Sequence, residues 1–380
     1  MISFQPTEEE IEFTSVAEKI AKEKIRPAAH VSENERKIDA AIIDEIAELG
    51  FLSLELPEDW DGLELPLISQ VQIMSALSSG DLGIVQGLPG LGDVASFIRK
   101  KPEQAVSKLE QAEHDAWSTA AFLDITNRDA PWANQLVVNT RADGYVLHGV
   151  SQPVRLACFA DYILVAARDA DGVPVVLWLD EPAVWRVKEG DVRLGLLASG
   201  VGRLSFDQAF VGKDQVLASG EKAADWIANA RTRIYVLQAA KEVGLMQAAL
   251  EYTTAYTAER KAFGQEIAKF QGVSFRVAKM AIETRIANHL VWRAAVKADR
   301  MDDDAQKWAM QALYRAHRSV RYVTDSAVQM LGGHGYVQEY PVEKWMRDAQ
   351  AQTMLYGREQ MLLNQYGEQI LIGAKEGATP

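Results

Sequence analysis

The feature that most constrains the fold is a block of short β-type runs in the middle of the chain, between two stretches of helical pattern. From residue 116 to about residue 217, runs rich in Val, Ile, Leu and Tyr alternate with turn sequences such as Asp169-Ala-Asp-Gly172. Many short strands with this punctuation are typical of a compact β-barrel or sandwich of about 100 residues. The predicted strands cover residues 136–140, 145–147, 162–166, 175–178 and 203–206.

Helices are predicted on both sides of this block. Thr7 and Glu10 form a capping box before a helical pattern that Pro27 closes, and a second helix covers residues 40–49. After residue 218 the pattern predicts helices over residues 224–259, 271–300, 304–330 and 358–373. We therefore predict a mainly α protein with a central β-domain. It has an N-terminal helical domain (1–115), a middle β-barrel domain (116–218) and a C-terminal four-helix bundle (219–380).

Composition excludes several classes of protein. The formal net charge of −13 argues against nucleic-acid binding, which needs a basic surface to neutralise phosphates. No stretch approaches the roughly 18 apolar residues of a membrane span, and the N-terminus lacks the features of a secretion signal. The single cysteine, Cys158, fits a reducing cytoplasm, and none of the six histidines forms a metal-ligand pair. We expect a cytoplasmic protein with no metal site, no membrane span and no nucleic-acid partner.

Two C-terminal motifs are the most informative about function. The run Gln329-Met-Leu-Gly-Gly-His-Gly-Tyr336 is followed by Glu339-Tyr-Pro-Val-Glu-Lys344 and by Arg347-Asp348-Ala349. Adjacent glycines allow close approach of the backbone to a ligand and leave amide groups free for it. Together the motifs resemble the C-terminal signature of the acyl-CoA dehydrogenases, FAD-dependent enzymes that desaturate acyl-CoA thioesters. With the order of helical and β segments, the resemblance covers nearly the whole chain.

The resemblance implies a set of FAD-binding residues. The run Glu259-Arg-Lys-Ala-Phe-Gly-Gln265 is similar to the turn between two bundle helices that reaches the FAD of a neighbouring subunit. An arginine beside a tight glycine turn can bind phosphate through charge-assisted hydrogen bonds. The residues that the resemblance assigns to this FAD are Arg260, Phe263 and Gln271, with Gln329, Gly332 and Gly333 on the adenosine side.

The sequence departs from the family where the flavin ring and the thioester would bind. In place of a Thr-Glu-Pro-like strand end and a Gly-Ser-Asp loop, it has Leu123-Asp-Ile-Thr-Asn-Arg-Asp-Ala-Pro131, in which Thr126 is the residue that matches. In place of a Trp-Ile-Thr-like strand it has Ser151-Gln-Pro-Val-Arg-Leu-Ala157. Pro153 is also a poor residue for a central strand, because it has no N–H to donate.

The catalytic base differs as well. Desaturation needs a carboxylate near the α-carbon to remove a proton. Nine residues after Arg347, where the resemblance implies a glutamate, the chain has Tyr356, and an unperturbed tyrosine pKa of about 10 disfavours a base at neutral pH. The helix position that carries the glutamate in some relatives corresponds to Ile234. The catalytic residue is therefore unassigned, with Tyr356 at the usual position and Glu359 as the nearby carboxylate.

These patterns leave four hypotheses open. In the first, the chain is a complementing subunit that finishes the FAD site of a related partner, and the partner supplies the ring pocket and the base. In the second, it is a homo-oligomeric acyl-CoA dehydrogenase with an unorthodox base. In the third, it is a flavin monooxygenase on the same fold, and in the fourth a binding protein without flavin. The first two imply FAD, an acyl-CoA thioester and a homo- or hetero-tetramer, while the acyl specificity cannot be read from these motifs.

Overall fold

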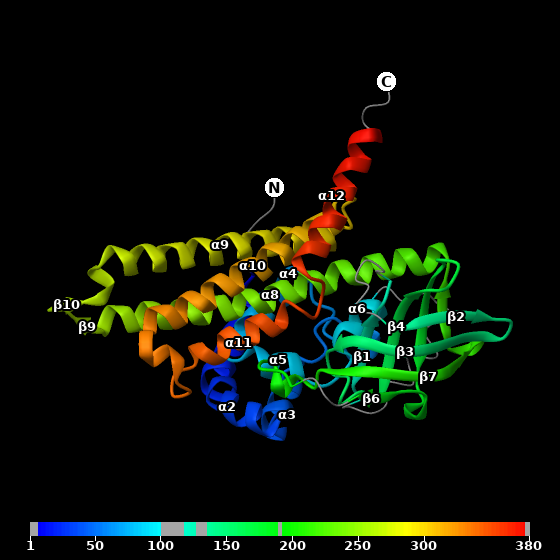
Figure 1. Cartoon of the computed structure of the whole chain (residues 1–380), viewed down its shortest axis with the longest axis horizontal. Coiled ribbons are helices and arrows are strands. Elements are labelled where there is room, and N and C mark those ends of the chain that lie inside the picture. The colour runs from blue at the N-terminus through cyan, green and yellow to red at the C-terminus, as the bar shows by residue number, and fades with distance from the viewer. Residues whose placement is uncertain (1–6, 100–117, 127–134, 189–191, 377–380) are drawn as a thin grey trace.

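The computed structural model describes residues 7–99, 118–126, 135–188 and 192–376 of the 380-residue chain. A bundle of long helices lies beside a β-domain, and the N-terminal helices pack below the bundle in the view of Figure 1. The predicted mainly α fold with a central β-domain is confirmed. None of the described helices combines the length and apolar character that crossing a membrane would require.

The N-terminal region is a set of helices around a shared apolar core. Thr7 and Glu10 form the predicted capping box, with 3.2 Å from the Glu10 amide to the Thr7 hydroxyl. The prediction that Pro27 closes the first helix is wrong, because the chain continues through a π-helical turn (Ala21–Ile25) into another helix. Pro27 lies in the first turn of that helix, where a missing N–H is tolerated. The helices are α1 (Glu8–Ile20), α2 (Arg26–Glu35), α3 (Ala40–Glu48), α4 (Leu67–Ser78), α5 (Leu82–Gly87) and α6 (Ala95–Ile98).

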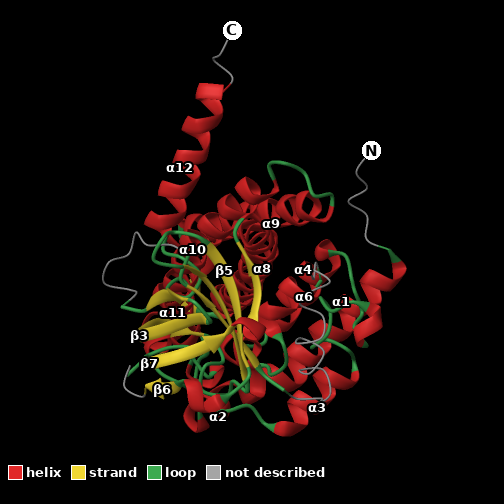
Figure 2. Ribbon diagram, turned by 90° about the vertical axis from the view of Figure 1, so that its right-hand side faces the viewer, coloured by secondary structure: helices red, strands yellow, loops and turns green. Residues whose placement is uncertain are grey.

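The β-domain consists of two four-stranded sheets packed face to face. Their strand orders are β1-β4-β5-β8 and β2-β3-β7-β6, and the apolar faces enclose a core that includes Leu147, Val165 and Leu204. Figure 2 shows the strands gathered on one side of the helices. The sequence analysis missed β1, β6 and β8. The strands are β1 (Ala120–Asp124), β2 (Val137–Arg141), β3 (Gly144–Val154), β4 (Tyr162–Arg168), β5 (Pro174–Leu179), β6 (Arg186–Lys188), β7 (Gly202–Gly212) and β8 (Val216–Ser219).

Pro153 lies in β3, although β3 is an inner strand of its sheet. The irregularity of the strand explains this. On one side, β2 pairs only with residues 144–148 of β3, and on the other side the register with β7 shifts between Val150 and Pro153. A proline is tolerated at such a position because no regular ladder hydrogen bond requires its N–H.

The bundle is built from three long helices whose close approach depends on buried alanines such as Ala239, Ala287 and Ala316. The final helix, α12, projects away from the rest of the bundle (Figure 1). The sequence analysis missed α11, which begins directly after Pro341. The helices are α8 (Glu221–Glu259), α9 (Gln271–Asp299), α10 (Ala305–Leu331), α11 (Val342–Gln352) and α12 (Glu359–Glu376).

The charged residues of the C-terminal motif join separate parts of the chain. Lys344 Nζ lies 2.5 Å from Asp81 Oδ2 and 2.7 Å from Asp348 Oδ2, and all three side chains are buried. Arg347 donates to Glu33 and Glu343. These ion pairs fix α11 against α2 and the Asp81 cap of α5, so that this part of the motif has a structural role.

Candidate functional site

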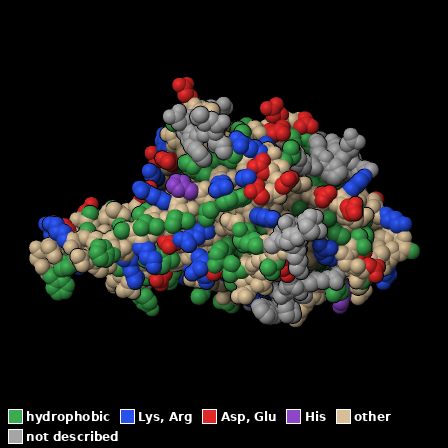
Figure 3. All heavy atoms as spheres, turned by 90° about the horizontal axis from the view of Figure 1, so that it is seen from above, with side chains coloured by type: hydrophobic (Ala, Val, Ile, Leu, Met, Phe, Trp, Pro, Cys, Tyr) green, Lys and Arg blue, Asp and Glu red, His purple; other side chains and the backbone are tan. Residues whose placement is uncertain are grey.

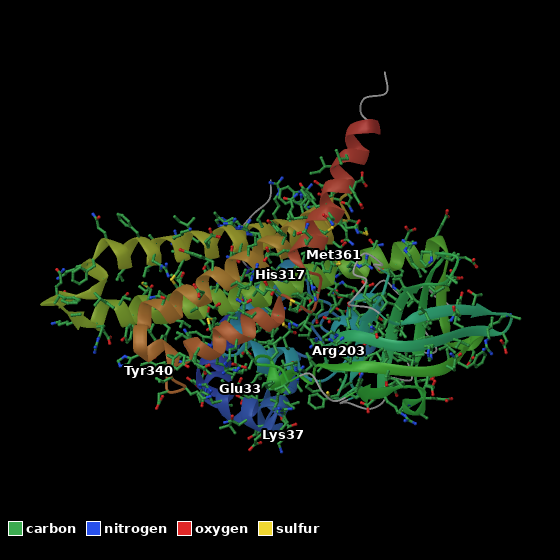
Figure 4. The ribbon with its side chains drawn as sticks, viewed as in Figure 1. Glu33, Lys37, Arg203, His317, Tyr340 and Met361 are labelled. Atoms are coloured by element: carbon green, nitrogen blue, oxygen red, sulfur yellow. The ribbon has the colours of Figure 1, made fainter. Side chains whose placement is uncertain are left out.

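A cavity of about 220 Å³ lies where the β-domain meets the bundle. Strands β1, β3 and β7, helix α8 and the segment between α11 and α12 all contribute side chains to its wall. Ile234, which the sequence analysis singled out, and Met361 of α12 are among the lining residues. Figure 4 shows Arg203 at the edge of the β-domain that faces the helices and Met361 near the base of α12.

One wall of the cavity carries a charged bridge between α8 and the end of β1. Arg231 donates through Nε to Asp124 Oδ2 at 2.9 Å and through Nη2 to the Thr126 hydroxyl at 2.5 Å. Burial lowers the pKa of the Arg231 guanidinium, but Asp124 outweighs this and holds the pKa above its ordinary value. Asp124 is the one carboxylate among the described lining residues. Because it is tied to Arg231, it is not a free base in this arrangement.

The segment between α11 and α12, which also lines the cavity, places Tyr356 against a buried carboxylate. The Tyr356 hydroxyl donates to Asp93 Oδ2 at 2.6 Å. Burial and the charge of Asp93 raise the pKa of the Tyr356 phenol well above its ordinary value. Asp93 stays ionised because Arg155 and Lys241 hold the pKa of its carboxyl below the ordinary value despite burial. Tyr356 is therefore a neutral hydrogen-bond donor at neutral pH and is unsuited to remove a proton.

The other proposed carboxylate points elsewhere. Glu359 forms an ion pair with Arg321 of α10 and is absent from the described residues that line the cavity. Tyr235, next to Ile234 on α8, does line the cavity, and burial raises its pKa to about 12. Among the described residues, no cluster of His, Cys, Asp and Glu could hold a metal ion.

A buried network of amides and charges continues behind Tyr356. Gln238 donates to Asp93 Oδ1 at 2.9 Å, and Lys241 donates to the side chain of Gln86 at 3.0 Å. Gln86 in turn donates to Gln238 at 2.6 Å. Burial, reinforced by the nearby Arg155, lowers the pKa of Lys241 to about 7. The network joins α5, α8 and the loop before α6, and no short sequence motif marks it.

The predicted FAD contacts of the hairpin lie at the other end of the bundle. Strands β9 (Lys261–Ala262) and β10 (Gln265–Glu266) form a short hairpin between α8 and α9. Arg260 and Gln271 flank it and are exposed, and Phe263 at its turn is 95% exposed. Phe263 also has a left-handed backbone, with φ of 53°, which is rare for a bulky residue. An aromatic side chain is thus held out into solvent by a strained turn.

The second group of predicted contacts is near the first. Gln329, Gly332 and Gly333 are exposed at the C-terminal end of α10. A Cβ added to either glycine would meet no atom within 4 Å, so the backbone there is open on the side where a side chain would stand. The Tyr256 hydroxyl, one turn before Arg260, lies 2.8 Å from Nδ1 of His334 and links the two segments. We call these two segments, residues 260–271 and 329–336, the bundle end.

The bundle end and the cavity are far apart in one chain. Arg231 and Arg260 are both on or at the end of α8, and 29 residues of helix correspond to about 44 Å. Figure 1 shows the β9–β10 hairpin and the β-domain at opposite ends of the molecule, and Figure 3 shows hydrophobic side chains on the surface of the projecting bundle end. One FAD molecule cannot reach both places in the same chain. If the bundle end binds FAD, as the resemblance implies, that FAD cannot be the one bound at this chain's own cavity.

The two places differ in how well they fit FAD. The bundle end offers an exposed arginine for the pyrophosphate, open glycine backbone and an exposed aromatic ring, which suits the phosphate-bearing half of the cofactor. At the cavity, Gln152 and Pro153 line the wall where the resemblance implies a tryptophan and a threonine, and the bridge from Arg231 to Asp124 crosses the end of β1. The residues present there do not match a flavin ring pocket of the expected kind.

Comparisons with known proteins agree with the sequence resemblance. The acyl-CoA dehydrogenase N-terminal domain matches residues 7–100, and the acyl-CoA dehydrogenase C-terminal domain matches residues 229–371. Benzylmalonyl-CoA dehydrogenase of Aromatoleum aromaticum is 26% identical, over 95% of this chain and 97% of its own length. The mitochondrial short-chain specific acyl-CoA dehydrogenase of Bos taurus is 28% identical, over 90% of this chain and 85% of its own. The structure of butyryl-CoA dehydrogenase from Megasphaera elsdenii superimposes with a TM-score of 0.86 at 24% identity, covering 97% of this chain and all of that one.

Proposed function

The chain belongs to the acyl-CoA dehydrogenase family, whose cofactor is FAD, and from this premise we propose that it is a complementing subunit of a heteromeric acyl-CoA dehydrogenase. It completes the FAD site of a related partner with its bundle end. The partner supplies the flavin ring pocket and the carboxylate that removes the α-proton from an acyl-CoA thioester. We further propose a cytoplasmic hetero-tetramer as the working assembly.

The observation that supports this proposal most is the contrast within one chain. Arg260, Phe263 and Gly332, which reach away from the chain, are present and exposed. At the position of the usual base, the Tyr356 hydroxyl donates a hydrogen bond to Asp93, and its raised pKa keeps the phenol neutral. Such a chain can contact the phosphate-bearing half of a partner's FAD. Among the described residues that line its own cavity, however, there is no carboxylate free to act as a base.

The second candidate is a homo-oligomeric dehydrogenase with an unorthodox base. It is favoured by one observation, the presence of Asp124 in the cavity wall. For Asp124 to act, Arg231 would have to release it, since Arg231 Nη2 lies 2.7 Å from Asp124 Oδ2 and the guanidinium occupies that carboxylate oxygen. This candidate expects Asp124→Asn to abolish turnover, whereas the complementing role does not.

The visible spectrum of the purified chain tests the proposal. Expressed alone, the chain should be colourless and should stay so when FAD is added, and it should turn yellow when co-expressed with a related chain that keeps the glutamate. That complex should contain one FAD for every two chains. Replacing Arg260 by Ala should lower the flavin content of the complex. The matched control, Arg285→Ala on the exposed face of α9, should leave the flavin content unchanged.

Contrary results point to the other hypotheses. One FAD per chain in the protein expressed alone, with oxidation of acyl-CoA, would exclude the complementing role. Oxygen consumption with reduced flavin and a substrate that is not a CoA ester would indicate the monooxygenase. A complex that forms but never binds flavin would indicate a binding role.

A further inference from the structure

A second, smaller cavity lies between the N-terminal helices and α8, next to the cavity described above. Its volume is about 70 Å³, its wall is mostly apolar, and Arg155 lines both cavities. One water occupies roughly 10–15 Å³ of such a volume, so there is room for a small organic molecule of about five non-hydrogen atoms. Several apolar lining residues are only half-buried, such as Leu52, Met74 and Pro89, which indicates that the cavity reaches the surface of the described chain.

Four charged side chains line this cavity, and three of them are held in ion pairs. Glu55 accepts a hydrogen bond from Arg233 Nη2 at 2.8 Å, and Arg155 Nε lies 3.5 Å from Asp93 Oδ2. Lys241 on α8 is the fourth, and it forms no ion pair among the described residues. The cavity therefore contains one amino group without a carboxylate to hold its proton.

The hydrogen bond that Lys241 does make goes to a neutral group of fixed orientation. Lys241 Nζ donates to Gln86 Oε1 at 3.0 Å. Nε2 of Gln86 donates to Gln238 at 2.6 Å and to Gln352 at 2.7 Å, so the amide oxygen is the atom that faces Lys241. A neutral amine with one donated hydrogen bond keeps a second N–H and its lone pair. Because Lys241 lines the cavity, both are available to a molecule bound there.

Lys344 shows what a buried lysine needs in order to remain charged. Lys344 is 3% exposed and Lys241 is 6% exposed. Two carboxylates lie 2.5 Å and 2.7 Å from Lys344 Nζ, and they raise its pKa although burial opposes them. Burial, followed by the nearby Arg155, lowers the pKa of Lys241 to about 7, and Asp93 opposes this only in part. The same residue type is thus a structural cation in one place and largely a neutral amine in the other.

We infer that Lys241 is a nucleophilic amine that captures a small aldehyde or ketone in this cavity as a Schiff base. A lysine that is desolvated and placed beside another cation is the kind that reacts with carbonyl compounds. The Lys241 nitrogen attacks the carbonyl carbon and forms the C–N bond, and the carbonyl oxygen leaves as water with the two amine hydrogens. The apolar wall and the small volume favour a short, uncharged aliphatic compound. The inference does not rest on the complementing role, because the bundle end takes no part in it.

Reductive trapping with the full chain tests the inference. The chain is incubated with propanal at about pH 7.5, and sodium cyanoborohydride reduces any imine to a stable secondary amine. Peptide mapping by mass spectrometry then gives the labelling rate of each lysine. An amine with the ordinary lysine pKa of about 10.4 is neutral in about one molecule in a thousand at this pH. Lys241 should therefore be labelled at least tenfold faster than the exposed Lys222, and the buried Lys344 should stay unlabelled.

Two further conditions separate the cavity from general lysine reactivity. Pyridoxal phosphate is a larger, anionic aldehyde, so it should label exposed lysines such as Lys222 and leave Lys241 largely unmodified. With propanal, the preference for Lys241 over Lys222 should decline between pH 7 and pH 9. The reason is that the Lys241 amine is already largely neutral there, whereas ordinary lysine amines are still losing their protons.

Three variants separate reactivity from folding. Lys241→Met removes the nucleophile, and its peptide should no longer carry the propanal label. Leu237→Phe enlarges a half-buried side chain one turn before Lys241 and narrows the cavity without removing the amine, so it should at least halve the labelling rate of Lys241. Lys222→Met is the matched control, and it should leave the labelling of Lys241 unchanged. The melting temperature of each variant shows whether it is folded.

Several results would overturn the inference. They are equal propanal labelling of Lys241 and Lys222 in the folded chain, modification of Lys241 by pyridoxal phosphate as fast as by propanal, or the absence of any adduct at Lys241. None of these results bears on flavin content, so a failure here is distinct from a failure of the complementing role.

Discussion

The bundle end and the cavity are built in opposite ways. The bundle end consists of two short segments, and the residues expected to contact FAD in it are exposed, as with Arg260, Phe263 and Gly333. The backbone at Gly333 is also open, because an added Cβ there would meet no atom within 4 Å. At the cavity, several polar groups are buried or half-buried and are bound to partners far away in sequence, as with Tyr356 and Asp93, which are 263 residues apart. Changes at the bundle end should therefore affect assembly, and changes at the cavity should affect stability.

The comparison also explains which family features survived. A residue that contacts only a partner can be kept while the chain's own pocket changes, since the two places lie at opposite ends of the molecule (Figure 1). In the proposed complementing subunit no flavin ring constrains the cavity, so charged residues can occupy its wall, provided that each is paired or hydrogen-bonded. The bridge between Arg231 and Asp124 meets that condition.

The largest effect on stability is expected from Asp93→Asn. This change leaves Arg155 and Lys241 buried without their shared carboxylate, and breaking a buried ion pair costs about 3–5 kcal/mol. Chemical denaturation should measure a loss of that size in the free energy of unfolding. Asp325→Asn, at an exposed position on α10, is the control and should change little. Similar losses in both variants would mean that Asp93 is not buried in a charged network.

The next effect is a dependence of stability on pH that originates at Lys241. The folded chain releases this proton near pH 7, whereas the unfolded chain holds it up to about pH 10.5. Between these values the unfolded state binds more protons, so the free energy of unfolding rises with pH, by about 2.5 kcal/mol from pH 7 to pH 9. Lys241→Met should remove this rise, and Lys222→Met, at the exposed start of α8, should retain it. Denaturation curves of each variant at pH 7 and pH 9 measure this rise in the free energy of unfolding. If the rise is unchanged in Lys241→Met, another titrating group causes it.

A smaller loss is expected from Tyr356→Phe, which deletes the hydrogen bond to the charged Asp93. Hydrogen bonds to charged groups contribute about 1.5–3 kcal/mol, and other donors to Asp93 remain, so the loss should be near the lower value. In the assembled complex, turnover should stay within about twofold of the unmodified protein, because the hydroxyl does not act as a base. Tyr336→Phe, at an exposed position, controls for the substitution itself. A loss of turnover in a folded Tyr356→Phe complex would restore Tyr356 as a catalytic candidate.

The smallest effect on stability should come from Arg260→Ala, within about 0.5 kcal/mol, because the side chain is exposed. The same change should weaken FAD retention by the complex about tenfold or more, as expected for a lost charge-assisted hydrogen bond to phosphate. Flavin release measured by fluorescence during dialysis would detect it. An Arg260→Ala complex that keeps its flavin as tightly as the unmodified one would contradict the role of the bundle end.

The sequence by itself determined the features that depend on short-range spacing. The periodicity of residues 271–300 and 304–330 predicted α9 and α10 to within a few residues, and the run from Gln329 to Tyr336 identified the family. It also predicted that the usual glutamate is missing, since Tyr356 is found by counting along the chain. Helical periodicity and motif spacing are local properties, so one sequence contains them in full.

Only the tertiary structure decided what surrounds the cavity. The sequence analysis gave no sign that Asp93 accepts the hydrogen bond of Tyr356, or that Arg155, Arg203 and Arg231 line one space. These residues come from separate parts of the chain, namely the 3-10 turn before α6, the segment between α11 and α12, the turn after β3, strand β7 and helix α8. Nor did the sequence analysis predict α11 or the continuation of the first helix past Pro27. Contacts between residues more than a hundred positions apart follow from how the elements pack, and packing is set by the whole core rather than by any one segment.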